Sequence, residues 1–188
     1  MDRPLLIFED LHKTPRRKLF TLFGVEWLAT PYAWLSPPFF CLLGIAAALL
    51  DHTESSLTMC MLMGVIYSLL LYACNTIYSL GHILGGTILG APMNALLVTG
   101  TRDVTVYIGS RAEVPLRIRM GRAVSGPLLN LLAGFLAVLF GRMLHVSWLT
   151  VFGYFNLGVG IWTLCPIPTM DGWVIWEGLL RRGNKPRP

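Results

Sequence analysis

Two residues in apolar parts of the sequence have side chains that can bind a metal or exchange a proton. His82 lies in YSLGHILGGTILGAP (78–92), and Asp171 lies in PIPTMDGW (166–173). Imidazole and carboxylate groups are common ligands of zinc, and both serve as general acids or bases. Each also has a structural interpretation. His82 can be a hydrogen-bonded contact between helices, which the spacing alone favours, and Asp171 can belong to an exposed turn after two prolines.

His82 is the last member of a polar series. Asn75, Tyr78, Ser79 and His82 are spaced i, i+3, i+4, i+7, so they share one face of a helix. A polar face on a membrane helix points into the bundle rather than toward lipid. The sequence therefore predicts that these side chains point toward other helices.

A third motif, SGPLLN (125–130), opens another apolar run. Pro127 suits the first turn of a helix, and Asn130 would then lie one turn further on, where its amide needs a partner. Gly81 and Gly85 have the spacing that lets another helix approach closely.

The composition predicts a membrane protein with one helical bundle. The chain is 54% hydrophobic and only 13% charged, against about 25% charged in soluble domains, and its mean hydropathy is +0.61. Its basic residues cluster between the apolar runs, which is typical of orientation signals, so we expect no nucleic-acid partner. The four cysteines lie inside apolar runs without a CxxC pair, and we interpret them as small buried side chains.

The apolar runs predict an all-α membrane protein with about four transmembrane helices and a small β-ribbon at the membrane surface. Residues 1–30 form an N-terminal cytoplasmic or interfacial segment, residues 31–176 the transmembrane domain, and residues 177–188 a basic cytoplasmic tail. The basic clusters place both termini in the cytoplasm. The predicted spans are about 34–50, 57–90, 124–142 and 147–165, with the ribbon at 95–120.

Taken together, the three motifs resemble those of the site-2 proteases, zinc metalloproteases that cut transmembrane helices within the bilayer. That family has HExxH before a β-ribbon, AGPxxN at the start of the next helix, and N-x-x-P-x-P-x-x-D-G after the last. Here the LGH and LGAP pieces of YSLGHILGGTILGAP match, SGPLLN has Ser125 for alanine, and Pro166 to Gly172 keeps PxPxxDG. Asn156 stands further upstream than the family's asparagine. The resemblance covers roughly residues 19–178 and implies a site-2-protease-like core.

The resemblance also identifies what the chain lacks. It assigns the second and third zinc ligands of the family to His82 and Asp171, whereas Tyr78 replaces the first histidine and Ser79 replaces the glutamate that acts as general base. A catalytic zinc needs three protein ligands and an open water position, and a tyrosinate ligand is uncommon. We therefore predict no catalytic residue and no cofactor, with His82 and Asp171 as a vestigial metal site. Zinc is expected only if the altered site works with Tyr78 as the third ligand.

Three functions remain open from the sequence. The first is a pseudoprotease of the bacterial inner membrane that contacts membrane lipids and binds transmembrane helices of a partner protein, as a subunit of a membrane complex. Its helix-packing residues would be Asn130, Gly81, Gly85, Gly126 and Pro127. The second is an active zinc-dependent intramembrane protease with a non-standard metal site. The third is a polar path for protons or ions through Asn75, His82, Asn130 and Asp171.

Overall fold

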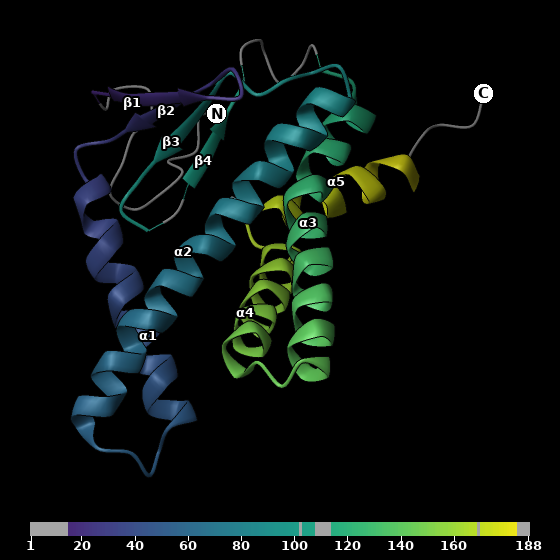
Figure 1. Cartoon of the computed structure of the whole chain (residues 1–188). Coiled ribbons are helices and arrows are strands. Elements are labelled where there is room, and N and C mark those ends of the chain that lie inside the picture. Colours follow the sequence, from purple (N-terminus) through teal and green to yellow (C-terminus); the bar gives the residue numbers. More distant parts are fainter. Residues whose placement is uncertain (1–14, 102, 108–113, 169, 184–188) are drawn as a thin grey trace.

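Long helices dominate the computed structural model, which describes residues 15–101, 103–107, 114–168 and 170–183 (Figure 1). Residues 1–14 of the predicted N-terminal segment, 102 and 108–113 of the predicted ribbon, and 184–188 of the predicted tail lie outside this description. The elements in chain order are β1 (Arg17–Leu22), β2 (Val25–Ala29), the 3-10 helix η1 (Ala33–Leu35), α1 (Ser36–Asp51), α2 (Leu57–Ile88), β3 (Ala95–Val98), β4 (Asp103–Val106), α3 (Leu116–Met143), α4 (Ser147–Thr163) and α5 (Asp171–Gly183).

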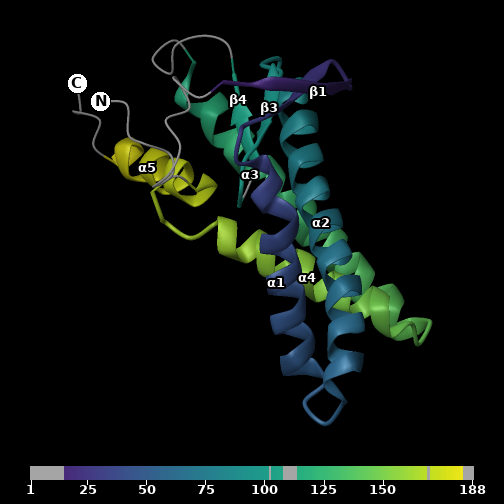
Figure 2. The ribbon, with the colours of Figure 1, turned by 90° about the vertical axis from the view of Figure 1, so that its left-hand side faces the viewer.

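The helices form two antiparallel pairs, α1 with α2 and α3 with α4, and α2 also packs on α3 (Figures 1 and 2). Glycines set the close approach within each pair. A Cβ atom at Gly44 of α1 would lie 2.3 Å from Ser68 Oγ, and one at Gly134 of α3 would lie 2.8 Å from the Leu157 side chain. Small residues at helix crossings are the usual means of packing in a membrane, where burial of apolar surface provides little net driving force.

Three helical segments are long and apolar enough to cross a membrane among the described residues: Ala33–Asp51, Leu57–Ile88 and Leu116–Met143. The fourth predicted span corresponds to α4, whose 17 residues place it at the short end of the range for spanning helices. Large apolar side chains are exposed along these helices, for example Leu50 at 81% and Ile88 at 82%. Lipid tails would cover such side chains, whereas water would leave them unfavourably exposed.

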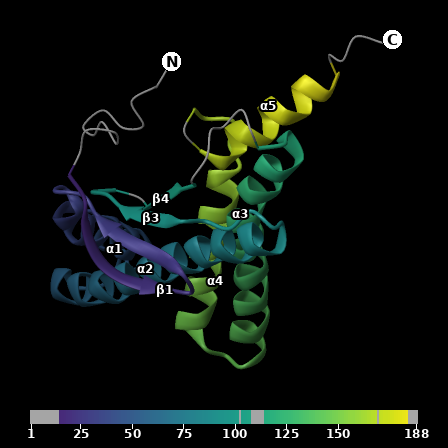
Figure 3. The ribbon, with the colours of Figure 1, turned by 90° about the horizontal axis from the view of Figure 1, so that it is seen from above.

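A four-stranded sheet in the order β1-β2-β3-β4 lies beside the C-terminal half of α2 (Figures 1 and 3). β1 and β2 form an antiparallel hairpin, β2 pairs in parallel with β3, and β3 pairs antiparallel with β4. Buried Val25, Met93 and Leu96 pack against Ile83 of α2, which attaches the sheet to that helix. The sheet therefore holds β4 next to the polar face of α2.

The predicted class of a helical membrane protein with a small β element is confirmed, but several element boundaries were wrong. Within the predicted N-terminal segment of residues 1–30, residues 17–22 and 25–29 form β1 and β2, strands that were not predicted, because the parallel β2–β3 pairing stabilises them.

The predicted ribbon at 95–120 also extended too far. Its strands are β3 and β4, and the alternating stretch after Pro115 is the first turn of α3, which begins at Leu116 instead of residue 124. Residues 177–183 of the expected basic tail belong to α5. Gly178 of α5 packs closely on Met120 of α3, and this contact favours helix in both segments.

Candidate functional site

His82 and Asp171 are in contact, although 89 residues separate them in the sequence. His82 Nε2 lies 3.1 Å from Asp171 Oδ2, and His82 is only 2% exposed. The hydroxyl of Tyr78, one helical turn before His82, donates a hydrogen bond to the same Oδ2 atom. Asp171 is the first residue of α5, where the helix dipole favours a negative charge. Tyr78, His82 and Asp171 therefore form one connected polar group between α2 and α5.

The backbone of α3 determines which nitrogen of His82 carries a proton. His82 Nδ1 lies 2.9 Å from the carbonyl oxygen of Arg122, and a carbonyl can only accept, so Nδ1 is the donor. The contact between Nε2 and Asp171 then requires one further proton between the two atoms. Gly126 also packs closely on the ring, because a Cβ atom there would lie 2.3 Å from Nε2. The imidazole is thus fixed in position and orientation.

The other half of the polar face of α2 contacts a carboxylate that sequence reasoning missed. Asp103, the first residue of β4, accepts hydrogen bonds from Asn75 Nδ2 at 2.7 Å and from Ser79 Oγ at 3.3 Å. Burial raises the pKa of Asp103 to about 6, against the opposing effect of these two hydrogen bonds. The only local signal for Asp103 was a single charge at the start of a short β-branched run, which does not indicate a partner.

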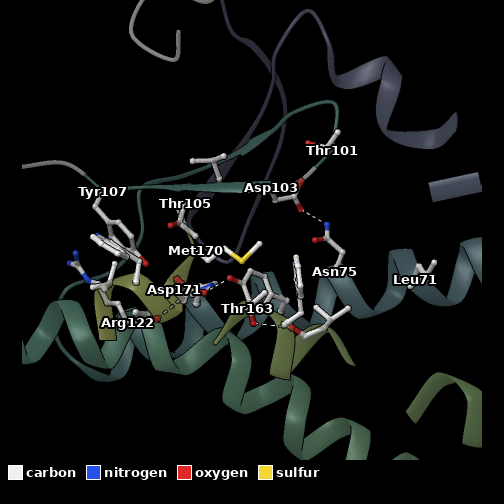
Figure 4. A pocket seen from close by; sticks show the side chains of 18 of the residues that line it. Leu71, Asn75, Thr101, Asp103, Thr105, Tyr107, Arg122, Thr163, Met170 and Asp171 are labelled. Atoms are coloured by element: carbon white, nitrogen blue, oxygen red, sulfur yellow. Dashed lines mark hydrogen bonds and ion pairs between the residues drawn. The ribbon is translucent and has the colours of Figure 1, made fainter. Parts of the chain in front are cut away.

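A cavity of about 770 Å³ joins the two carboxylates. Its walls come from α1, α2, β4, α3, α4, α5 and the residues next to them, and it is lined by Tyr78, His82, Asp103 and Asp171 together with aromatic and aliphatic side chains. Figure 4 shows Asn75 and Asp103 at one end, Arg122 and Tyr107 at the other, and Asp171 between them. The volume lies within the range of small-molecule sites, about 300–1,000 Å³.

The predicted packing residues lie where α2 crosses α3. A Cβ atom at Gly81 would meet the Ser125 carbonyl oxygen at 2.6 Å, and one at Gly85 would meet the Ser125 side chain at 2.2 Å. Pro127 is buried in the interior of α3 instead of its first turn, because α3 begins at Leu116. Asn130 is completely buried and absent from the cavity lining, and neither amide atom has a hydrogen-bond partner among the described residues.

The donor set does not fit a catalytic zinc. Among the described residues, no three His, Cys, Asp or Glu side chains gather where they could hold a metal ion. The third donor near His82 and Asp171 is the phenol of Tyr78, which still carries the proton it donates to Asp171. The imidazole alone has the arrangement of a metal ligand, with Nδ1–H bonded to a carbonyl. What the site provides is two carboxylates, each already bonded to side chains of α2.

Comparisons with known proteins agree with this architecture. No family model matches the sequence, and no curated protein matches it. Among solved structures, the site-2 protease from Methanocaldococcus jannaschii superimposes with a TM-score of 0.60 at 18% identity, over 90% of this chain and 74% of that one. The chain has a site-2-protease-like fold. The resemblance inferred from the three motifs is confirmed at the level of fold, and together with the apolar helices it indicates an integral membrane protein.

Proposed function

We propose that this protein is a catalytically inactive, site-2-protease-like membrane protein that binds transmembrane helices of a partner, as a subunit of a membrane complex. One observation carries the proposal. Tyr78 and Ser79, which replace a zinc ligand and a general base in the motif, both donate hydrogen bonds to carboxylates of the chain itself. These replacements thus contribute to the packing of α2 on its neighbours, and neither provides a base or a metal ligand.

Peptide hydrolysis requires an activated water and a group that removes its proton. Asp103 and Asp171 are the carboxylates that line the cavity. Asp103 accepts hydrogen bonds from Asn75 and Ser79, and Asp171 accepts one from Tyr78 and shares a proton with His82 Nε2. Burial raises the pKa of Asp103 to about 6, but its two hydrogen bonds act against that rise and hold the carboxylate against α2. We propose that the protein works without a cofactor and that His82 and Asp171 tie α2 to α5.

The cavity supports helix binding by its size and its walls. Its volume of about 770 Å³ lies in the upper part of the range of ligand sites, about 300–1,000 Å³. Its walls include Phe40 and Leu43 of α1 and Trp162 of α4, and Trp162 is 58% exposed. Such a surface suits the apolar side chains of a partner helix, and the polar groups at its base suit a kinked or unwound turn.

The basic clusters before α1, between α2 and α3, and after α4 support a topology with both termini in the cytoplasm. In this topology the sheet and the polar cavity lie at the cytoplasmic side of the membrane. We place the protein in a bacterial inner membrane.

Metal analysis and a cleavage assay test the inactive state together. Purified protein, His82→Ala and Asp171→Ala would be compared by elemental analysis in detergent. Their action on a single-spanning helix labelled with a dye at each end would also be measured. We expect zinc at background in all three proteins and no cleavage. Cleavage by the unmodified protein that His82→Ala abolishes would overturn the proposal.

Crosslinking tests helix binding. A photoreactive residue would replace Leu71, which lines the cavity, or Leu69 on the same helix, which is 64% exposed and absent from the lining. We expect Leu71 alone to form an adduct with a transmembrane segment of one protein in native membranes. We also expect Val159→Trp, which fills the cavity, to reduce that adduct. Equal adducts from both positions would refute a specific helix site.

The alternative function, an active protease with a non-standard metal site, is favoured by one observation. His82 already has the Nδ1–H to carbonyl bond that orients metal-ligating histidines, and its Nε2 contacts the same Asp171 Oδ2 atom as the Tyr78 hydroxyl. Stoichiometric zinc lost in both His82→Ala and Asp171→Ala would support this alternative.

A further inference from the structure

Two arginines of α3 line the cavity without a hydrogen-bonding partner for their Nε atoms. Arg119 and Arg122 lie three residues apart, so they project from the same face of the helix. Both Nε atoms are buried and have no hydrogen-bond partner among the described residues. An unpaired buried donor on a charged group is costly, and an anion bound between the two side chains would remove that cost.

The carboxylates of the cavity do not supply that anion. Asp103 accepts its hydrogen bonds from Asn75 and Ser79, and Asp171 accepts one from Tyr78 and shares a proton with His82. Arg122 lies instead over the ring of Tyr107, with 3.9 Å between the guanidinium carbon and the ring centroid. Figure 4 shows Arg122 beside Tyr107 at this end of the cavity. The positive charge there therefore has no carboxylate of the cavity bonded to it.

The rest of the cavity wall is apolar, as in a binding site for an amphiphilic ligand. Phe39, Phe40 and Leu43 of α1, Leu71 of α2, and Val159 and Trp162 of α4 line the same cavity. All six belong to helices that carry exposed apolar side chains. In contrast, Arg119 and Arg122 lie in the first two turns of α3, at the end of the bundle that carries the sheet (Figure 1). A ligand that fills this cavity needs an anionic group at one end and hydrocarbon at the other.

We propose that the cavity binds an anionic phospholipid, with its phosphate on Arg119 and Arg122 and an acyl chain along the wall formed by α1 and α4. A planar guanidinium binds phosphate oxygens through two parallel hydrogen bonds, and basic pockets between membrane helices on the cytoplasmic side are typical lipid-headgroup sites. A free phosphate would use the arginines but leave the apolar wall uncovered. The proposal is independent of the partner helix, and lipid would occupy the cavity when no helix does.

Native mass spectrometry of the full chain in detergent, titrated with phosphatidylglycerol, tests the site. We expect the double variant Arg119→Gln/Arg122→Gln to weaken binding at least tenfold, since two charge-assisted contacts are lost. Arg117→Gln is the matched control, because Arg117 lies on the same helix, is exposed and is absent from the cavity lining. It should change binding less than twofold. Equal binding by the double variant and the control would overturn the proposal.

Two further measurements distinguish a lipid from a soluble anion as the ligand. Glycerol phosphate, the soluble headgroup, should fail to displace the lipid at concentrations far above that of the lipid. If it binds as tightly as the lipid does, the site takes a soluble anion and the lipid assignment is wrong. Val159→Trp, which keeps both arginines, should weaken binding of the lipid but not of glycerol phosphate. Unchanged lipid binding by that variant would also refute the assignment, and melting curves of all variants verify that they fold.

Discussion

Replacing Tyr78 by histidine is expected to create a zinc site at the contact between α2 and α5. The Tyr78 hydroxyl reaches Asp171 Oδ2, the same atom that lies 3.1 Å from His82 Nε2. An imidazole at position 78 is shorter than the phenol by roughly 2–3 Å, about the length of one Zn–N bond. The substitution therefore leaves space for a metal ion among three donors. His82 needs no rearrangement, because its Nδ1 is already bonded to the Arg122 carbonyl.

The size of the effect follows from the number of ligands. Loss of a residue that only orients a metal ligand costs about 10–100-fold in affinity, so gain of a complete ligand should tighten zinc binding by at least about 100-fold. Elemental analysis of Tyr78→His in detergent should give about one zinc per chain, and competition with a chelator gives the affinity. Tyr78→Phe, which removes the hydroxyl but adds no ligand, and Tyr78→His/Asp171→Asn should stay at background.

Two outcomes would refute this reasoning. A folded Tyr78→His protein without zinc would mean that the fold does not position the side chains at 78, 82 and 171 to bind a metal ion together. Stoichiometric zinc in the unmodified protein, with an affinity close to that of Tyr78→His, would mean that the phenol already serves as a ligand and that the present residues do form a metal site.

Two other substitutions test the contacts around this site. For Asp103, the folded pKa of about 6 lies above the ordinary 3.8, so the folded state binds more protons between these values. The free energy of unfolding should then fall by about 2 kcal/mol as pH rises from 4 to 6, out of about 3 kcal/mol over the whole titration. Asp103→Asn should remove most of that slope in denaturation measured across this range, and an unchanged slope would contradict the assignment. Gly126→Ala should destabilise the protein by about 1–3 kcal/mol, because the new Cβ atom would lie 2.3 Å from His82 Nε2. Gly158→Ala in α4, with nothing within 4 Å, should be neutral or slightly stabilising, and equal melting temperatures for both variants would argue against the packing role of Gly126.

The sequence predicted those parts of the fold that depend on local pattern. Helices α1, α2 and α4 begin and end within two residues of the apolar runs at 34–50, 57–90 and 147–165, because a long apolar run has few structural alternatives. The contact between His82 and Asp171 could also be anticipated, since the motif and the basic clusters placed both residues at the same membrane depth.

What the sequence did not predict depends on pairings between distant residues. Strand β2 pairs with β3 through Glu26 and Ala95, so its extended conformation is stabilised by residues far along the chain. Asp103 becomes part of the site only because the β3–β4 hairpin places it against α2. The first turns of α3 were predicted as a strand but form a helix. Their alternating pattern is typical of a strand, whereas the packing of Met120 on Gly178 stabilises the helix.

The two replaced positions of the metalloprotease motif are best understood as a pair, because each side chain bonds to a different carboxylate. Tyr78 contacts Asp171 at the start of α5, and Ser79 contacts Asp103 at the start of β4. A carboxylate at position 79 would face that of Asp103, and two neighbouring carboxylates are stable only when one of them is protonated. A serine at position 79 instead donates a hydrogen bond to Asp103 and needs no shared proton. A glutamate at this position would therefore raise the pKa of Asp103 further, which is why we interpret the present residues as a packing arrangement in their own right.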